Sequence, residues 1–240
     1  MFEQIVRLNN AGVLLAQYGH LNEAVEKLET TLKTKLILDT VLKVGGLTSN
    51  DVSPQSILPY PDTTSIQFDV SYLNEIPIHS QNLQSSCPEG LQLFTKLFRL
   101  VEGAPPSAVN ATIVVNLGLS CHARNRFSPL VPMYYKISMA LLIGAPSSGT
   151  TKFTAVVLNN LGVWYYDNKD SVRSHFCFRM LSDLLGSAKN GESEKIFLSN
   201  VERMAATTDS ATPSVPVLVS GGTPLWWSMP FRYHILALRK

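Results

Sequence analysis

Apolar residues recur every three or four positions over much of the chain, which is the period of an amphipathic helix. Between residues 4 and 17 this stripe consists of Ile5, Leu8, Ala11 and Leu15. The pattern stops at Gly19-His20, and Asn22 is then a suitable N-cap for a second helix, with acidic residues in its first turn. The second stripe ends at Gly45-Gly46. We therefore predict a helical hairpin over residues 1–44.

The same period predicts several further helices. Their expected ranges are 89–102, 107–123, 132–143, 151–167, 171–185 and 192–205, with a loop over 144–150. Asp170 is a candidate N-cap between two of them. The last helix would cover the open core face that terminal repeats leave exposed. Residues 107–206 are thus expected to hold two more hairpins and a capping helix.

Two stretches break the helical pattern. Residues 45–65 contain three prolines and many polar residues, which indicates a loop. After it, Ile66, Phe68 and Val70 alternate with polar residues, and Ile76 and Ile78 do the same, so a short β-hairpin is predicted. Together with the helix expected over 89–102, these residues form an insertion over 45–106.

A linker and a Trp-rich tail are expected over residues 207–240. The tail contains Trp226, Trp227 and Phe231. Three interpretations of the tail stay open. It covers the open end of the helices, it docks on another protein or a membrane surface, or it is an unselected extension.

One short phrase returns along the chain. Leu8-Asn9-Asn10-Ala11-Gly12 recurs as Leu158-Asn159-Asn160-Leu161-Gly162, and a more divergent copy is Val114-Val115-Asn116-Leu117-Gly118. Glycine inside a helix costs about 1 kcal/mol relative to alanine, so its recurrence indicates close packing of the two helices in each pair. Repetition on this scale is typical of stacked helical hairpins.

The hairpins resemble tetratricopeptide repeats, in which large and small residues alternate at fixed positions of two helices. In the third copy these positions are Leu158, Leu161, Gly162 and Tyr165, followed by Ser174, Phe178 and Leu181. Gly118 and Gly162 lie 44 positions apart, whereas the standard motif repeats about every 34. The longer period is more similar to the repeats of kinesin light chains. The resemblance implies an all-α fold, a short α-solenoid of antiparallel hairpins with a Pro-rich insertion and a tail of low order; an irregular helical-repeat relative is the alternative.

The resemblance also implies a binding groove, because the first helices of such repeats line a concave surface. The positions that it assigns to the groove are Asn9, Val13, Gln17, Leu119, His122, Asn159, Val163 and Tyr166. Asn9 and Asn159 could hydrogen-bond the backbone of an extended peptide, since the amide both donates and accepts. Alternatively, they bond to the neighbouring hairpin. Only the first asparagine of the doublet is expected to face the groove, and the middle copy has Val115 there.

The function expected from this resemblance is that of a scaffold that binds another protein or an extended peptide. The alternative is a structural role in which the stacking faces and the tail form a homo-oligomer. An enzyme is not expected, because no catalytic set is evident. In addition, Thr150 stands where a phosphate-binding loop over residues 141–151 would need lysine. No cofactor or metal is expected either, since Cys121 and His122 would point in different directions on a helix.

Composition narrows the partners and the compartment. The net charge of +2 argues against a nucleic-acid partner. Three widely spaced cysteines fit a reducing compartment. The longest apolar stretch, 130–145, is interrupted by polar residues and falls short of the roughly 20 apolar residues of a membrane span. With no secretory signal evident, a cytoplasmic location is expected.

Overall fold

The computed structural model describes residues 2–46, 69–79, 90–142, 147–185 and 192–208. In this part the chain is mainly helical, with seven α-helices and one two-stranded sheet. The helices are α1 (Phe2–Gln17), α2 (Leu21–Gly46), α3 (Pro106–Arg124), α4 (Leu130–Leu142), α5 (Ser148–Asp167), α6 (Ser171–Leu185) and α7 (Glu192–Thr208). A 3-10 turn, η1 (Val70–Tyr72), leads into β1 (Leu73–Pro77), and β2 (Lys96–Leu100) precedes α3. The prediction of a mainly helical chain is confirmed.

Most helix bounds agree with the predicted ones within a few residues, and the differences have local causes. α5 begins three residues earlier than predicted because Ser147 and Thr150 form a capping box, in which each side chain bonds to the other residue's backbone N–H. Asp170 caps α6 as expected, since its carboxylate accepts from the N–H of Arg173 at 3.1 Å. α2 begins at Leu21, so Asn22 lies inside its first turn and is not the cap.

The prediction for the insertion is wrong in two respects. Residues 90–100 do not form a helix; they are extended and end in β2. β1 pairs with β2, not with the residues around Val70, which lies in η1. Residues 47–68 lie outside the described part of the chain. They include Ile66, Phe68 and all of the predicted loop after Gly46. Most of the expected linker and tail, from residue 209 onward, lies outside it as well.

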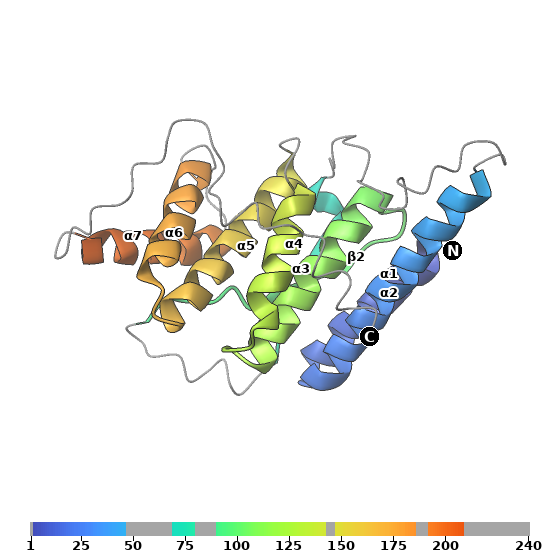
Figure 1. Cartoon of the computed structure of the whole chain (residues 1–240), viewed down its shortest axis with the longest axis horizontal. Coiled ribbons are helices and arrows are strands. Elements are labelled where there is room, and N and C mark those ends of the chain that lie inside the picture. The colour runs from blue at the N-terminus through green and yellow to red at the C-terminus, as the bar shows by residue number, and fades with distance from the viewer. Residues whose placement is uncertain (1, 47–68, 80–89, 143–146, 186–191, 209–240) are drawn as a thin grey trace.

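Each helix packs against the next one along the chain, and Figure 1 shows them side by side in chain order from α1 to α7. The recurring glycines make this packing close. A Cβ built on Gly12 would lie 2.8 Å from Cγ of Leu28, on Gly118 2.8 Å from Cε1 of Tyr135, and on Gly162 2.8 Å from Cε2 of Phe178. The reason inferred for the glycines is therefore confirmed: each admits a large side chain of its partner helix.

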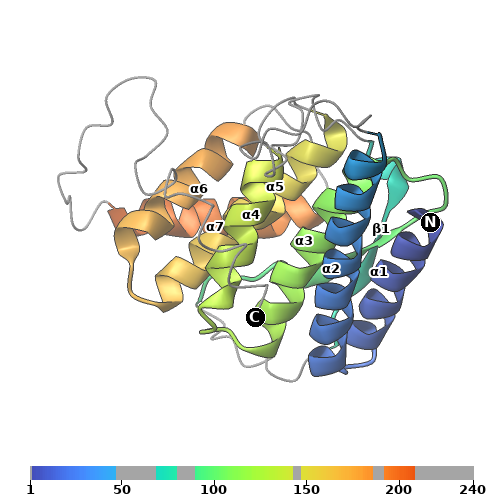
Figure 2. The ribbon, with the colours of Figure 1, turned by 45° about the vertical axis from the view of Figure 1, so that its right-hand side comes forward.

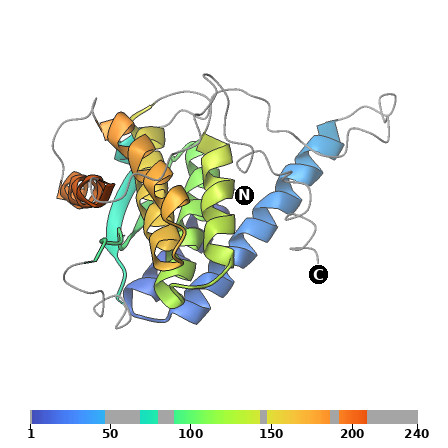
Figure 3. The same ribbon diagram turned by 60° about the vertical axis from the view of Figure 1, so that its left-hand side comes forward.

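The two strands lie on one side of the row of helices, away from α2 (Figures 2 and 3). They are antiparallel, with Leu73 opposite Leu100 and Pro77 opposite Lys96. The sheet packs against α1 and α3, while η1 packs against α5. Leu97, Phe98 and Leu100 of β2 are all buried in the same apolar core as the helices. The insertion thus contributes to the main core.

No helix within the described ranges is long and apolar enough to cross a membrane.

Candidate functional site: an asparagine ladder

An extended segment, residues 90–100, is held by asparagine side chains of α1, α3, α5 and α7, and we call it the resident segment. We refer to these four helices as the first helices, because α1, α3 and α5 each open a helix pair. In four places one asparagine amide bonds to both the N–H and the carbonyl of a single residue of this segment. The four pairs are Asn200 with Gln92, Asn160 with Phe94, Asn116 with Phe98, and Asn10 with Leu100. All eight distances lie between 2.7 and 2.9 Å.

These four residues, the asparagine ladder, come from α1, α3, α5 and α7. The segment runs from α7 back to α1, opposite to the order of the helices. A carboxamide suits the task because it carries a donor and an acceptor side by side, as a neighbouring β-strand would. A carboxylate could only accept, so aspartate would leave the carbonyl of the segment without a donor.

Each asparagine of the ladder, together with the segment residue that it holds, is called a rung. Two further asparagines connect these rungs. The side-chain oxygen of Asn9 accepts from Asn116 at 3.1 Å, and that of Asn159 accepts from Asn200 at 2.8 Å. Nδ2 of Asn159 also donates to Asn160 and to the carbonyl of Gln92. Each connecting residue thus joins two first helices, α1 to α3 and α5 to α7.

The connections coincide with the spacing of the rungs. Where a connecting asparagine is present, successive rungs hold residues two positions apart on the segment, at 98 and 100 and at 92 and 94. Between α3 and α5 the equivalent position is Val115, and there the rungs hold residues four apart, Phe94 and Phe98.

The opposite edge of the resident segment belongs to β1. The N–H of Ile78 donates to the carbonyl of Thr95 at 2.9 Å, and the N–H of Val101 donates to that of Tyr72 at 3.1 Å. From Thr95 onward, the backbone groups of odd-numbered residues therefore face β1, and those of even-numbered residues face the ladder, as the alternation of an extended chain requires. This part of the segment is held on both edges.

Side chains of the resident segment fill the core on both faces. Leu91, Phe94, Leu97, Phe98 and Leu100 are buried. At about 1.5–3 kcal/mol for each fully buried side chain of this size, their burial is a major part of the stabilisation of the fold. A hydrogen bond and an ion pair anchor the segment further. Arg203 donates to the carbonyl of Gly90 at 2.6 Å. Lys96 pairs with Glu75, which also pairs with Lys152.

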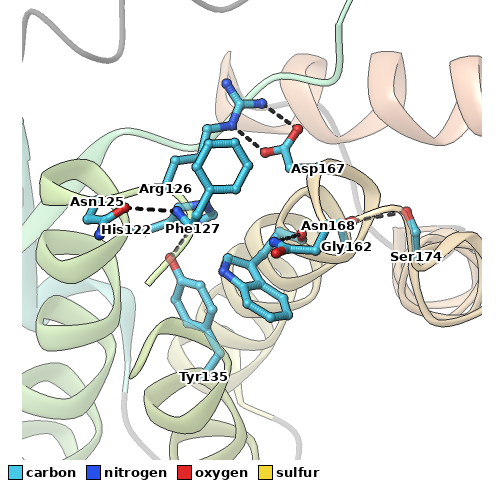
Figure 4. Close-up of polar contacts among 10 residues, drawn as sticks. His122, Asn125, Arg126, Phe127, Tyr135, Gly162, Asp167, Asn168 and Ser174 are labelled. Atoms are coloured by element: carbon cyan, nitrogen blue, oxygen red, sulfur yellow. Dashed lines mark hydrogen bonds and ion pairs between the residues drawn. The ribbon is translucent and has the colours of Figure 1, made fainter. Parts of the chain in front are cut away.

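One rung is continued by a buried polar chain. Asn160 donates to the hydroxyl of Tyr135 at 3.2 Å, and this hydroxyl lies 3.3 Å from Nδ1 of His122, the contact drawn in Figure 4. Burial, together with the charge of Arg126, lowers the pKa of His122 from 6.5 to about 3. The imidazole is therefore neutral at neutral pH, and Tyr135 can donate to it while accepting from Asn160.

An ion pair closes the same region at the surface. Arg126 follows α3 and Asp167 ends α5, and the two side chains pair through two nitrogen–oxygen contacts (Figure 4). This bidentate geometry joins the turn of one helix pair to the end of the next first helix.

Most of the groove positions that the resemblance assigns lie beside the resident segment in the structure. Asn9 and Asn159 are buried at the ladder. Leu119 and His122 border a small cavity of about 10 Å³ together with Leu93, Phe94 and Thr95. Val163 is buried on α5, whereas Tyr166, near the end of α5, is 42% exposed.

The expectation about the asparagine doublet needs correction. The first asparagine was expected to be the only one of the doublet that faces the groove. Asn9 and Asn159 do donate to carbonyls of the segment. The second asparagine faces the segment as well, and Asn10 and Asn160 each hold both groups of one segment residue. The middle copy also has this residue, Asn116, so the ladder does not skip it. The alternative for Asn9 and Asn159 is present as well, since both bond to a neighbouring helix.

Asn200 was missed by the sequence reasoning, which treated its helix only as a cap. The signal was Leu198-Ser199-Asn200-Val201, a fourth copy of the phrase in which Glu202 stands at the glycine position.

A surface hollow of about 1050 Å³ adjoins the last rung, between α1 and the sheet. Its lining includes Asn10, Val13 and Gln17 of α1 together with Ile76 and Arg99 of the strands. Two of the inferred groove positions, Val13 and Gln17, therefore border open space next to Leu100.

The described residues offer little for other chemistry. Among them, no three His, Cys, Asp or Glu side chains are grouped in a way that could hold a metal ion. Cys121 and Cys177 are free and buried, and burial raises the pKa of each thiol to about 12, so neither is a nucleophile at neutral pH. Searches of family models, curated proteins and solved structures found no match to this chain.

Proposed function

We propose that the protein is a non-enzymatic interaction module, a short tetratricopeptide-like array whose concave groove binds an extended segment of a partner protein. The observation that carries this proposal is the asparagine ladder, which holds the N–H and carbonyl of Gln92, Phe94, Phe98 and Leu100. Contacts to the backbone do not depend on residue type. The same ladder can therefore hold another extended chain whose side chains fit.

In this proposal the partner replaces the resident segment. A tethered segment competes at an effective concentration on the order of millimolar. A partner that makes only the same contacts is therefore a weak competitor at micromolar concentrations. The hollow beside the last rung offers a partner additional surface, including Gln17, that a longer segment can cover.

The test weakens the resident segment and supplies it again in trans. Phe98→Ala in the full chain removes a buried ring, which weakens retention of the segment by about 100-fold or more. A fluorescent peptide of residues 90–102 should then bind with a dissociation constant on the order of 10 μM, given the millimolar competition. N-methylation of Phe94 in the peptide removes the N–H that Asn160 accepts from, while the tethered segment keeps its own, and should weaken this binding at least about tenfold.

The matched control is the same peptide N-methylated at Glu102, beyond the last rung. Asn168→Ala is the control in the protein, because the side chain of Asn168 is exposed and donates to the carbonyl of Trp164 in its own helix. Neither change should affect peptide binding. If the folded Phe98→Ala chain does not bind the peptide at all, the groove is a closed part of the fold and the proposal fails.

The second candidate function is self-association. Leu14 lies on α1, at the end of the row, and Tyr18 directly follows this helix. The two residues are 51% and 69% exposed, which favours a contact with another molecule at this end. Light scattering of the chain, of Leu14→Glu, and of a form without residues 225–240 tests it. A monomer in all three samples rules this function out.

A further inference from the structure

We infer that the groove selects a partner segment with two aromatic residues four positions apart and an aliphatic residue two positions further on. This inference rests on the proposed function and concerns the class of partner for the same site. In the resident segment these positions are Phe94, Phe98 and Leu100, each on a rung of the ladder.

The two aromatic positions are lined by aromatic side chains of the helices. The ring of Phe94 lies 5.9 Å from that of Phe197 on α7, and the ring of Phe98 lies 4.7 Å from that of Phe153 on α5. The two segment rings also stack on each other at 5.7 Å with an interplanar angle of 12°. Aromatic pairs at these separations add stabilisation beyond the area they bury, so rings are favoured over aliphatic side chains here.

The ladder determines the spacing of the two rings. Asn160 and Asn116 hold residues four apart, at the one step where no connecting asparagine stands. Residues four apart on an extended chain lie on the same face, so both rings point the same way and can stack. A shift of one residue would place Thr95 and Arg99 on these rungs and turn the rings toward the other face.

The position between the two rings adds a charge preference. Lys96 lies there, and its ammonium group is 3.0 Å from the carboxylate of Glu75 on β1. An acidic residue at this position would place a second negative charge beside that carboxylate, which also pairs with Lys152. Arg99, by contrast, is exposed at the rim of the hollow and is free to vary. Leu97 is buried in the core, so its position also requires an aliphatic residue. The selected pattern is therefore aromatic, any, basic, aliphatic, aromatic, any, aliphatic.

Peptide variants test the pattern against the full-length Phe98→Ala chain. Phe94→Ala and Phe98→Ala in the fluorescent 90–102 peptide should each weaken binding by about 100-fold. Lys96→Glu should weaken it by about tenfold, and Arg99→Ala, the control, should change it by less than about threefold. If the two alanine peptides bind as tightly as the parent peptide, the inferred pattern is wrong although the groove binds peptides.

The outcomes separate the two proposals. Failure of the parent peptide to bind overturns the proposed function, whereas equal binding of all peptides overturns only the pattern. If Phe98→Ala does not fold, Phe98→Leu keeps most of the side-chain volume and serves in its place. The peptides can also be ranked by affinity without any substitution in the protein. For this, NMR measures the change in the amide chemical shifts of the wild-type chain when each peptide is added at millimolar concentration.

Discussion

Asn160 of α5 holds both backbone hydrogen-bonding groups of Phe94, at 2.8 Å to the N–H and 2.9 Å to the carbonyl. The two residues are 66 positions apart in the chain. The contact shows that the insertion is not an appendage to a row of helices. Its resident segment lies on the surface that the first helices form together. Phe94 of the segment and Leu158 and Leu161 of α5 belong to one apolar core.

Loss of this rung should destabilise the protein. Asn160→Ala leaves the N–H and carbonyl of Phe94 buried without partners, and each such group costs about 1–3 kcal/mol. We expect a decrease of about 2–4 kcal/mol in the free energy of unfolding, measured by urea denaturation. The exposed Asn168→Ala should cost less than about 1 kcal/mol. Equal effects of the two substitutions would contradict a structural role for the rung.

The recurring glycines should tolerate alanine to different degrees. An added Cβ on Gly118 would meet the ring of Tyr135, whose hydroxyl is already bonded to His122 and Asn160. On Gly12 it would meet Leu28, whose aliphatic side chain has no hydrogen bond to lose when it shifts. Alanine gains about 1 kcal/mol in helix propensity, against about 1–3 kcal/mol for overpacking.

Gly118→Ala should therefore lower the thermal midpoint of unfolding more than Gly12→Ala does, as differential scanning calorimetry can measure. A Gly118→Ala variant that is more stable than the wild type would show that the helices of this pair have room to separate.

Stability should depend on the protonation of His122. The pKa of this residue is lowered to about 3 in the folded chain from 6.5. Between these values the unfolded chain binds a proton that the folded chain does not, so the free energy of unfolding falls as the pH falls. The slope is up to about 1.4 kcal/mol per pH unit.

Urea denaturation at pH 7.5 and pH 5.0 isolates this contribution when the wild type is compared with His122→Gln. The wild type should lose about 2 kcal/mol more than the variant over this range. The same pH dependence in both proteins would mean that the imidazole is not held neutral by burial.

Phe98 should be among the most costly residues to truncate in the resident segment. Its ring is buried between those of Phe94 and Phe153. Phe98→Ala should therefore lower the free energy of unfolding by about 3–5 kcal/mol, whereas the exposed neighbour Arg99→Ala should stay within about 0.5 kcal/mol. A comparable loss at both positions, measured by guanidinium denaturation, would argue against a packed segment.

The helices were predictable from the sequence because their apolar residues recur with the helical period. Residues 171–185 match α6 at both ends, and the recurring glycines indicated the close pairs correctly. The extended segment was not predictable in this way. Leu91, Phe94, Leu97 and Phe98 are spaced like a helical stripe, but they are buried on both faces of an extended segment. A segment enclosed on both sides has no polar face, so its spacing does not indicate its conformation.

The ladder was visible in the sequence only in part. Asparagine recurs two positions before the glycine in all three copies, as Asn10, Asn116 and Asn160, whereas the position before it is asparagine in only two. Recurrence alone would have favoured the second asparagine as the functional one. The ligand of the ladder could not be inferred, because it depends on contacts between residues about 20 to 110 positions apart.

Amide hydrogen exchange of the resident segment, followed residue by residue by NMR, tests most directly whether asparagine side chains hold its backbone. The amides of Gln92, Phe94, Phe98 and Leu100 donate to the ladder and should be strongly protected in the wild type. In Asn160→Ala, protection should fall most at Phe94 and less at Leu100, which another asparagine holds. Exchange of all four amides at the rate of an unstructured chain in the folded wild type would contradict the account.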